Sequence, residues 1–187
     1  MLKFFKEMNL PNKLTCIRVV LIIPFVIFVL GGKCEGIWKW LALATFCIAS
    51  ITDFFDGKIA RSRNLVTDFG KFMDPLADKV LVCGALIAMI ELGRVPAWYV
   101  ILVIAREFII SGFRLVAADN GIVIAASMWG KFKTTFLMIE VIFLILGFET
   151  GIGYYVTQAL LWICAALVLI SMVDYIWKNR QIFAEQK

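Results

Sequence analysis

The sequence contains no histidine. It therefore lacks the side chain that most often serves as a general base near neutral pH and as a metal ligand. This absence excludes a Ser-His-Asp triad and any histidine-ligated metal centre. Cysteine is sparse, and no two cysteines form a C-x-x-C pair. We interpret the five cysteines as small apolar residues within helices: Cys16, Cys34, Cys47, Cys83 and Cys164.

Charge is scarce as well, at 18% of the 187 residues, whereas 62% are hydrophobic. Ordinary soluble domains are roughly 45–50% apolar. One small core cannot hide so much apolar surface, so a soluble globule, a disordered chain and a disulfide-rich secreted scaffold are all excluded. The formal net charge is +5. In a membrane protein this charge is typical of cytoplasmic loops near anionic headgroups, and we predict no nucleic-acid partner.

The apolar residues suffice for about six bilayer crossings of roughly 20 residues each. Residues 1–13 alternate apolar and basic positions, which predicts a short helix on the membrane surface. No small-x-small cleavage site follows the first apolar run, so we expect it to be retained. The chain is predicted to be one all-α domain, 1–187, a polytopic bundle of six transmembrane helices: about 14–30, 37–60, 72–92, 96–116, 132–148 and 154–177.

Lysine and arginine in the short loops predict the orientation. The side that holds both termini carries Lys3, Lys6, Lys13, Arg61, Arg63, Lys71, Lys131, Lys133, Lys178, Arg180 and Lys187. The opposite loops carry only Lys33, Lys39 and Arg94. The first side is therefore predicted to be cytoplasmic, in the cell membrane. The aromatic residues expected as interfacial anchors at the outer ends are Trp38, Trp40, Trp98, Tyr99, Tyr154 and Tyr155.

Four aspartates lie near the cytoplasmic ends of two consecutive segments. Asp53 and Asp56 share a helix face at i, i+3, and Asp74 and Asp78 share another at i, i+4. A short connection predicts antiparallel neighbours, so the carboxylates would converge and repel one another unless cations lie between them. Four oxygen donors without histidine or cysteine favour Mg²⁺ or Mn²⁺, with room for two ions. Such sites usually act on phosphates.

Neighbouring residues fit a phosphate ligand. Gly57 and Ala60 leave the helix face open to a ligand, and Arg61 can bind a diphosphate with its forked guanidinium. Thr67 either caps the next helix or donates to a phosphate. Pro75 allows two arrangements: Asp74 caps a helix that starts there, or the helix begins near Thr67 and passes through Pro75.

These residues together resemble a known family. The pattern Asp53-x2-Asp56-Gly57-x2-Ala60-Arg61-x8-Gly70-x3-Asp74-x3-Asp78 is similar to the complete signature of the CDP-alcohol phosphotransferases. The resemblance implies that a diphosphate is cleaved, that CMP is released and that an acceptor hydroxyl receives the phosphoalkyl group. It also implies that the four aspartates hold two divalent ions and that Asp78 is the general base.

The same resemblance assigns the nucleotide contacts. Gly57, Ala60, Arg61 and Thr67 match the part of the signature that contacts the cytidine nucleotide. The segment Pro11-Asn12-Lys13-Leu14-Thr15 resembles a further stretch that touches the nucleotide. For Asn12 and Thr15 a plain helix cap is the alternative. The resemblance also implies that the chain forms a homodimer and that membrane lipids surround it.

The acceptor is predicted from three further segments. The opening from Met8 to Arg18, the run from Ala105 to Arg114 and the run from Gly130 to Thr134 resemble bacterial phosphatidylglycerophosphate synthases. These enzymes transfer a phosphatidyl group from CDP-diacylglycerol to sn-glycerol 3-phosphate. The cations expected at the acceptor phosphate are Arg106, Arg114, Lys131 and Lys133, with ordinary positive-inside loop charge as the alternative.

Other functions fit parts of the pattern. The same chemistry could use inositol phosphate, serine or phosphatidylglycerol as acceptor. Carboxylates within a helix bundle also occur in membrane ion transporters. An ion path would need charges along the whole route, whereas here nearly all cluster at one side and only Glu140 lies deep in a segment. The pattern assigns no role to Glu140.

Overall fold

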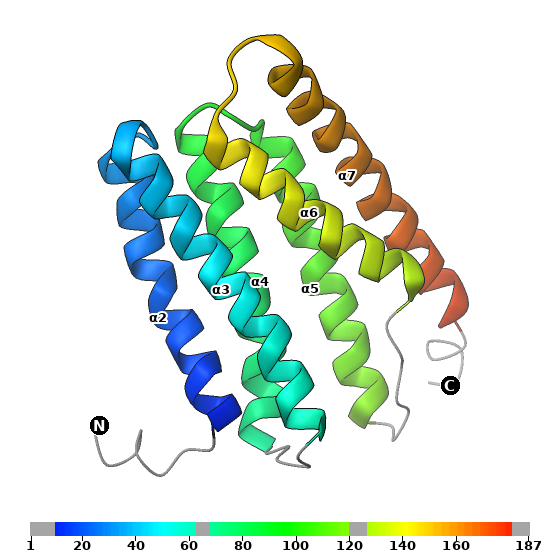
Figure 1. Ribbon diagram of the computed structural model, residues 1–187. Helices are drawn as coiled ribbons and strands as arrows, with labels where there is room; N and C mark the ends of the chain where they lie inside the picture. Colours follow the sequence, from blue (N-terminus) through cyan, green and yellow to red (C-terminus); the bar gives the residue numbers. More distant parts are fainter. Residues whose placement is uncertain (1–9, 63–67, 120–126, 181–187) are drawn as a thin grey trace. The chain divides into compact units, whose positions relative to one another are not determined.

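The computed structural model describes residues 10–62, 68–119 and 127–180. Within these ranges the regular structure consists of six α-helices (Figure 1): α2 (Leu10–Gly31), α3 (Gly36–Ser62), α4 (Asp68–Glu91), α5 (Ala97–Asp119), α6 (Met128–Leu146) and α7 (Gly151–Lys178). The prediction of an all-helical chain is confirmed for these residues, and each predicted segment corresponds to one helix.

The first helix begins earlier than predicted. Helix α2 starts at Leu10 rather than near Leu14, so residues 10–13 of the predicted surface helix continue the first apolar helix instead. Pro11 lies in the first turn, where proline is favourable because the backbone N–H groups have no partner within the helix. Residues 1–9, which hold most of the predicted surface helix, lie outside the described residues.

Helix α6 also begins before its predicted start at Phe132, because Ser127 caps it. The Ser127 hydroxyl accepts a hydrogen bond from the backbone N–H of Gly130 at 3.2 Å, which satisfies one of the unpaired donors of the first turn. The helix ends at Gly147, whose φ of 62° is left-handed, a conformation that glycine adopts without strain. The cap brings Lys131 and Lys133 into the first two turns of α6.

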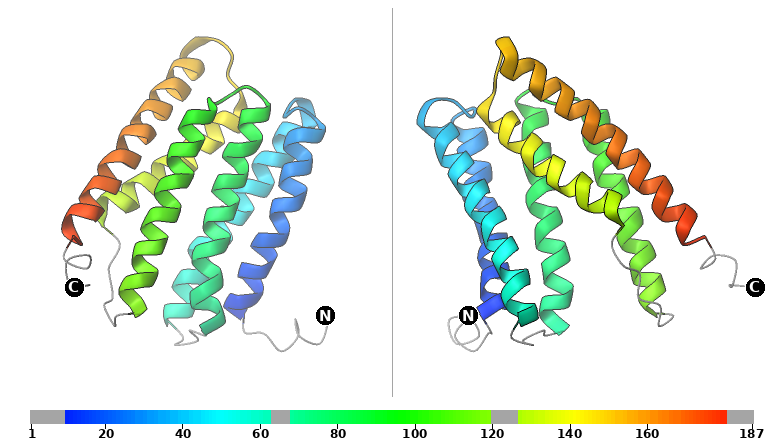
Figure 2. Two further views of the ribbon diagram at one scale, coloured as in Figure 1. Left: turned by 180° about the vertical axis from the view of Figure 1, so that it is seen from behind. Right: turned by 45° about the vertical axis from the view of Figure 1, so that its right-hand side comes forward.

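The described chain divides into two compact units, Met1–Leu92 and Gly93–Lys187. In the first unit α2 packs against both α3 and α4. The three helices lie side by side in each view (Figure 1, Figure 2). Phe25 and Phe46, both buried, join α2 to α3 with ring centroids 5.9 Å apart. The beginning of α2, the end of α3 and the beginning of α4 lie at the same end of this unit (Figure 1).

In the second unit α7 packs against α5 and α6. Arg94 precedes α5, and its Nη1 donates to the carbonyl oxygens of Leu144 and Ile145 at 2.6 and 3.1 Å. These contacts satisfy carbonyl groups that have no partner at the end of α6. The end of α5, the beginning of α6 and the end of α7 lie at one end of this unit (Figure 1).

One predicted interfacial anchor is wrong. Tyr99 is fully buried, and its hydroxyl donates a hydrogen bond to Glu140, so the two residues link α5 to α6. A buried carboxylate needs a donor, and Tyr99 supplies one. The prediction failed because the partner lies 41 residues away in the sequence. By contrast, Trp98 and Tyr155 are exposed, as expected of anchors.

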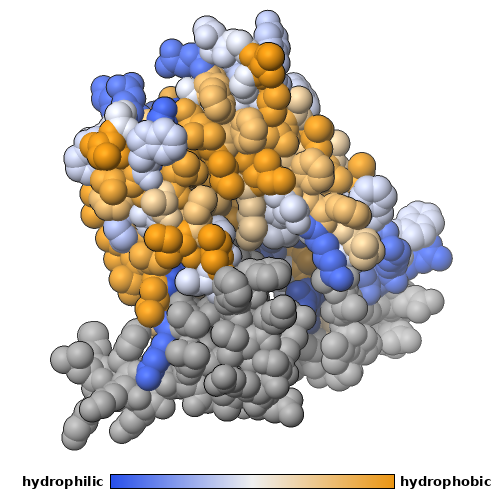
Figure 3. Space-filling model, viewed as in Figure 1, coloured by the Kyte–Doolittle hydropathy of each residue, from blue (hydrophilic) through white to orange (hydrophobic). Residues whose placement is uncertain are grey.

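The described surface is rich in large apolar side chains (Figure 3). Every described helix exposes some, including Ile23, Trp40, Ile87, Phe108, Phe132 and Trp162. By length and composition, helix α7 is long and apolar enough to cross a bilayer. Helices α5 and α6 each carry three charged side chains within their apolar stretch (Arg106, Glu107, Arg114; Lys131, Lys133, Glu140). Such a surface is typical of membrane association.

Candidate functional site

The two aspartate pairs lie at matching levels on α3 and α4. Asp56 lies six residues before the last residue of α3, and Asp74 lies six residues after the first residue of α4. At a rise of 1.5 Å per residue, each lies about 9 Å from its helix end. Asp53 and Asp78 lie nine and ten residues from those ends, at about 14–15 Å. Both helix ends lie at the same end of the first unit (Figure 1). Measured along the helices from that end, Asp56 and Asp74 form one level, and Asp53 and Asp78 form a second level about one turn deeper.

The connection between α3 and α4 limits how far apart the two helix ends can lie. Five residues separate Ser62 from Asp68, and a fully extended chain of that length spans at most about 20 Å. Asp74 lies in the second turn of α4, so the alternative in which it caps the helix is wrong, and the helix passes through Pro75. The side chains of the aspartates, Gly57, Ala60 and Arg61 lie outside the described residues, as does the whole of Thr67.

The donor chemistry of these positions fits a hard divalent cation. The set consists of carboxylates, which suit Mg²⁺ and Mn²⁺ and, without cysteine or histidine, do not favour zinc. Among the side chains that the structure describes, no group of three or more acidic or cysteine residues is placed to hold a metal ion. The candidate metal site consists of the aspartate positions on α3 and α4.

A buried cation lies at the same level of the first unit. Arg18, only 1% exposed, lies eight residues after the first residue of α2, at about 12 Å from the end where the aspartate helices meet. This level falls between the two aspartate levels, and α2 packs against both aspartate helices. A buried guanidinium is stable only where negative charge or hydrogen-bond acceptors compensate it.

The second unit holds a charged cluster of three charged side chains and one serine (Arg106, Glu107, Lys133 and Ser171). Arg106 Nη1 donates to Glu107 Oε1 at 2.9 Å, and Lys133 Nζ donates to the same carboxylate oxygen. On the other side, Arg106 Nε donates to Ser171 Oγ at 3.1 Å. Arg106 and Lys133 are 7% and 4% exposed. The cluster thus joins α5, α6 and α7 and holds two cations in defined positions.

Only two of the four cations predicted at the acceptor phosphate meet in this cluster. Lys131 is exposed, because it precedes Lys133 by two residues and therefore points about 200° away around α6. Arg114 is also exposed, two turns beyond Arg106 on α5. Arg114 and Arg106 both interact electrostatically with Tyr175 of α7. The structure thus joins Arg106 to Lys133 through Glu107, whereas Lys131 faces elsewhere.

Comparison with known protein families identifies the family of this chain. The family model described as CDP-alcohol phosphatidyltransferase matches residues 8–170. This range contains both aspartate helices and most of the charged cluster. The chain belongs to this family. The chain is therefore an enzyme, and the use of divalent metals is typical of its family.

Curated relatives cover nearly the whole chain. A protein of Bacillus subtilis (strain 168) is 43% identical over 184 residues, which cover 91% of this chain and 95% of the relative. A Rickettsia felis protein is 38% identical and covers 95% and 98%, and a Shigella flexneri serotype 5b protein is 40% identical and covers 96% and 100%. Each is named CDP-diacylglycerol–glycerol-3-phosphate 3-phosphatidyltransferase.

The segment that is predicted to contact the nucleotide lies at the start of α2. Asn12 and Thr15 both lie within the helix, so neither is its N-cap and the alternative of a plain helix cap is wrong. Their side chains lie outside the described residues. The start of α2 shares one end of the first unit with the end of α3, which carries Gly57, Ala60 and Arg61 (Figure 1).

The sequence did not indicate two residues of α7: Ser171, which belongs to the cluster, and Tyr175, which interacts electrostatically with Arg106. They are spaced i, i+4 and therefore share a helix face, with Asp174 and Lys178 completing a polar patch in an otherwise apolar helix. Polar residues at helical spacing at the C-terminal end of the last apolar segment were the available signal. The family signature runs from Asp53 to Asp78 and does not extend to α7.

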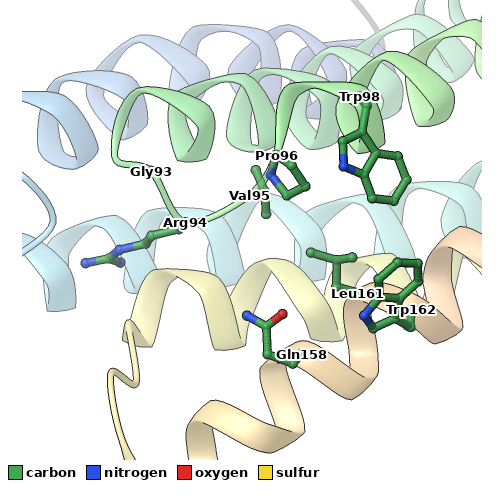
Figure 4. Close-up of a pocket in the computed structure, with 8 residues that line it drawn as sticks. All are labelled: Gly93, Arg94, Val95, Pro96, Trp98, Gln158, Leu161 and Trp162. Carbon is green, nitrogen blue, oxygen red and sulfur yellow. The ribbon is translucent and has the colours of Figure 1, made fainter.

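A separate hollow lies at the opposite ends of α5 and α7. This cavity of about 440 Å³ is lined by the loop of Gly93–Pro96, by Trp98 and by Gln158, Leu161 and Trp162. Trp98 and Trp162 face one another with ring centroids 5.9 Å apart, and Arg94 points away from them (Figure 4). Arg106 lies eight residues beyond Trp98, about 12 Å along α5. The cavity is therefore distinct from the charged cluster.

Proposed function

We propose that the enzyme transfers the phosphatidyl group of CDP-diacylglycerol to sn-glycerol 3-phosphate, giving phosphatidylglycerophosphate and CMP. The observation that carries this proposal is the agreement among relatives that are 38–43% identical over nine-tenths or more of the chain and are all named for this reaction. At such coverage, the comparison includes both the residues proposed to bind the acceptor and those proposed to bind the donor.

The chemistry follows from the substrates. The acceptor hydroxyl oxygen forms a bond to the phosphorus that carries the diacylglycerol. The bond between that phosphorus and the bridging diphosphate oxygen breaks, and CMP leaves with the electron pair. Asp78 takes the proton of the acceptor hydroxyl as a general base. A carboxylate can do so because the hydroxyl becomes more acidic as its bond to phosphorus forms.

Asp53, Asp56, Asp74 and Asp78 hold two ions, Mg²⁺ or Mn²⁺, in this proposal. Bound there, the ions would neutralise diphosphate oxygens and stabilise the charge that develops on the leaving CMP. Asn12, Thr15, Gly57, Ala60, Arg61 and Thr67 bind the nucleotide. The matching levels of the aspartates on α3 and α4 support this arrangement, as does the position of the start of α2 at the same end (Figure 1).

The acceptor phosphate is bound by the basic residues of the second unit. Arg106 and Lys133 form the buried part of this site, and Glu107 holds them in place. Arg114 and Lys131 contribute from more exposed positions. A guanidinium forms paired hydrogen bonds with phosphate oxygens, so a phosphorylated acceptor suits this site better than serine does.

We place the enzyme in the cell membrane as a single catalytic domain with six transmembrane helices, a surface segment at its start and both termini and the site on the cytoplasmic side. We expect a homodimer that takes its lipid substrate sideways from the bilayer. The exposed apolar side chains on every described helix support contact with lipid.

The test is CMP release by purified enzyme with CDP-diacylglycerol and Mg²⁺. The acceptors sn-glycerol 3-phosphate, inositol phosphate, serine and phosphatidylglycerol are added singly. We expect release only with sn-glycerol 3-phosphate, and none after chelation of the divalent metal. Release with another acceptor would overturn the acceptor assignment. No release with any acceptor, from folded protein, would overturn the transferase and reopen the transporter alternative.

A further inference from the structure

Tyr175 is a buried tyrosine whose hydroxyl forms no hydrogen bond with the described residues. The residue lies near the end of α7 and is 3% exposed. Its ring packs edge-to-face against Phe113 of α5, with centroids 6.1 Å apart. The hydroxyl is buried and has no hydrogen-bond partner among the described residues. Buried hydroxyls are normally paired, because burial removes their hydrogen bonds to water. An unpaired one therefore calls for an explanation.

The described charged groups that interact electrostatically with Tyr175 are hydrogen-bond donors. Arg106 and Arg114 both interact electrostatically with Tyr175, and a guanidinium offers only donors. Ser171, one turn earlier on the same face of α7, accepts a hydrogen bond from Arg106 and donates one to the carbonyl of Val168 at 3.0 Å. Asp174, the adjacent carboxylate, pairs with Lys178 through Oδ1 at 2.6 Å, and its Oδ2 is buried with no hydrogen-bond partner among the described residues.

An anion with several acceptor oxygens would satisfy all of these donors at once. The Tyr175 hydroxyl can donate one hydrogen bond, and each guanidinium can donate more than one. A phosphate monoester offers three terminal oxygens that accept hydrogen bonds and carries negative charge that the two arginines neutralise. A neutral alcohol offers neither the charge nor the number of acceptors.

We propose that the Tyr175 hydroxyl is a further binding group for the acceptor and donates a hydrogen bond to the phosphate of sn-glycerol 3-phosphate beside Arg106 and Arg114. This inference rests on the proposed function, since it extends the acceptor site by a residue that the sequence did not indicate. Tyr175 then contributes to the preference for phosphorylated acceptors over unphosphorylated ones.

The test is Tyr175→Phe, which keeps the ring contact with Phe113 and removes only the hydroxyl. A hydrogen bond to a charged group corresponds to about tenfold or more in affinity. We therefore expect the KM for sn-glycerol 3-phosphate to rise about tenfold, whereas the KM for CDP-diacylglycerol stays unchanged. Tyr155→Phe is the matched control, because Tyr155 is 72% exposed at the other end of α7.

A second measurement separates binding from stability. Without ligand, the thermal midpoint of Tyr175→Phe should equal that of the wild type, because the hydroxyl loses no partner. The rise in that midpoint caused by sn-glycerol 3-phosphate, or by inorganic phosphate, should be smaller in the variant. An unchanged KM, or a lower midpoint without ligand and an unchanged rise with it, would overturn the inference and make the hydroxyl structural.

The two proposals fail in different ways. If the wild type releases no CMP with sn-glycerol 3-phosphate, the proposed function fails. In that case stabilisation by inorganic phosphate still compares Tyr175→Phe with the wild type, and equal stabilisation would overturn the anion site itself. If the wild type is active and Tyr175→Phe has the same KM, only the inference about Tyr175 fails.

Discussion

At the scale of single residues, Asp78 carries the sharpest chemical prediction. The variant Asp78→Asn keeps the size of the side chain but cannot accept a proton from the acceptor hydroxyl. General-base catalysis contributes about 10²–10⁴ in rate, so we expect CMP release to fall by at least about 100-fold. Part of the binding of CMP, measured by calorimetry, should remain, because other residues also contact the nucleotide.

Asp174→Asn is the matched control for this change. Asp174 lies on α7, outside the range of the family match, and pairs with Lys178, whose side chain is 62% exposed. Exposed ion pairs contribute about 0–1 kcal/mol, so the control should keep nearly full turnover. Unchanged turnover in Asp78→Asn would contradict its role as the base.

Single residues also show why part of the site could not be predicted from the sequence. The spacing of the aspartates within α3 and α4 is a local property, and local spacing gives helix faces directly. The pairing of Lys133 with Glu107 spans 26 residues and that of Arg106 with Ser171 spans 65. Such pairs depend on how helices pack. The sequence therefore suggested one group of four cations, whereas the structure joins Arg106 and Lys133 through Glu107 and leaves Arg114 and Lys131 exposed.

At the scale of the helices, the approximate place of each helix in the sequence was predicted better than its first and last residues. Apolar runs broken by glycine, proline and charge place each helix, because a helix that faces lipid must be apolar over its length. Its first and last turns depend on capping by individual side chains. Ser127 begins α6 before its apolar run, and Arg94 caps the end of α6 from the loop that precedes α5.

Glu107 connects the helices of the second unit, and its replacement tests that connection. Glu107→Gln would leave Arg106 and Lys133 buried without the carboxylate that both contact. Removing one partner of a buried ion pair costs roughly 3–5 kcal/mol. We expect a lower thermal midpoint in detergent and a higher KM for sn-glycerol 3-phosphate, with the KM for CDP-diacylglycerol little changed.

Glu149→Gln is the control for this variant, because Glu149 is exposed in the loop between α6 and α7. It removes the same charge without breaking a buried pair and should leave both quantities unchanged. If Glu107→Gln were as stable as the wild type, the carboxylate would not be what holds the two cations in place.

At the scale of the whole molecule, the distribution of charge and the proposed chemistry require the same orientation. Acceptor and CMP are water-soluble, whereas donor and product are lipids, so we expect the proposed site where a bilayer meets an aqueous compartment. The loops with most of the lysine and arginine are those beside the aspartates and the charged cluster, and positive loops stay on the cytoplasmic side. The end of α7 that carries Ser171 and Tyr175 is therefore predicted to be cytoplasmic.

Helix α7 offers a direct test of this orientation, since it is long and apolar enough to span a bilayer. Glu149 lies just before it, and Lys178 is its last residue. In intact cells, a membrane-impermeant maleimide should label Glu149→Cys but not Lys178→Cys, and both should react after lysis. The wild-type chain supplies the background of its own five cysteines. Labelling of Lys178→Cys alone would invert the orientation and place the charged cluster on the outer side, away from cytoplasmic substrates. Equal labelling of both positions in intact cells would show that α7 does not cross the membrane.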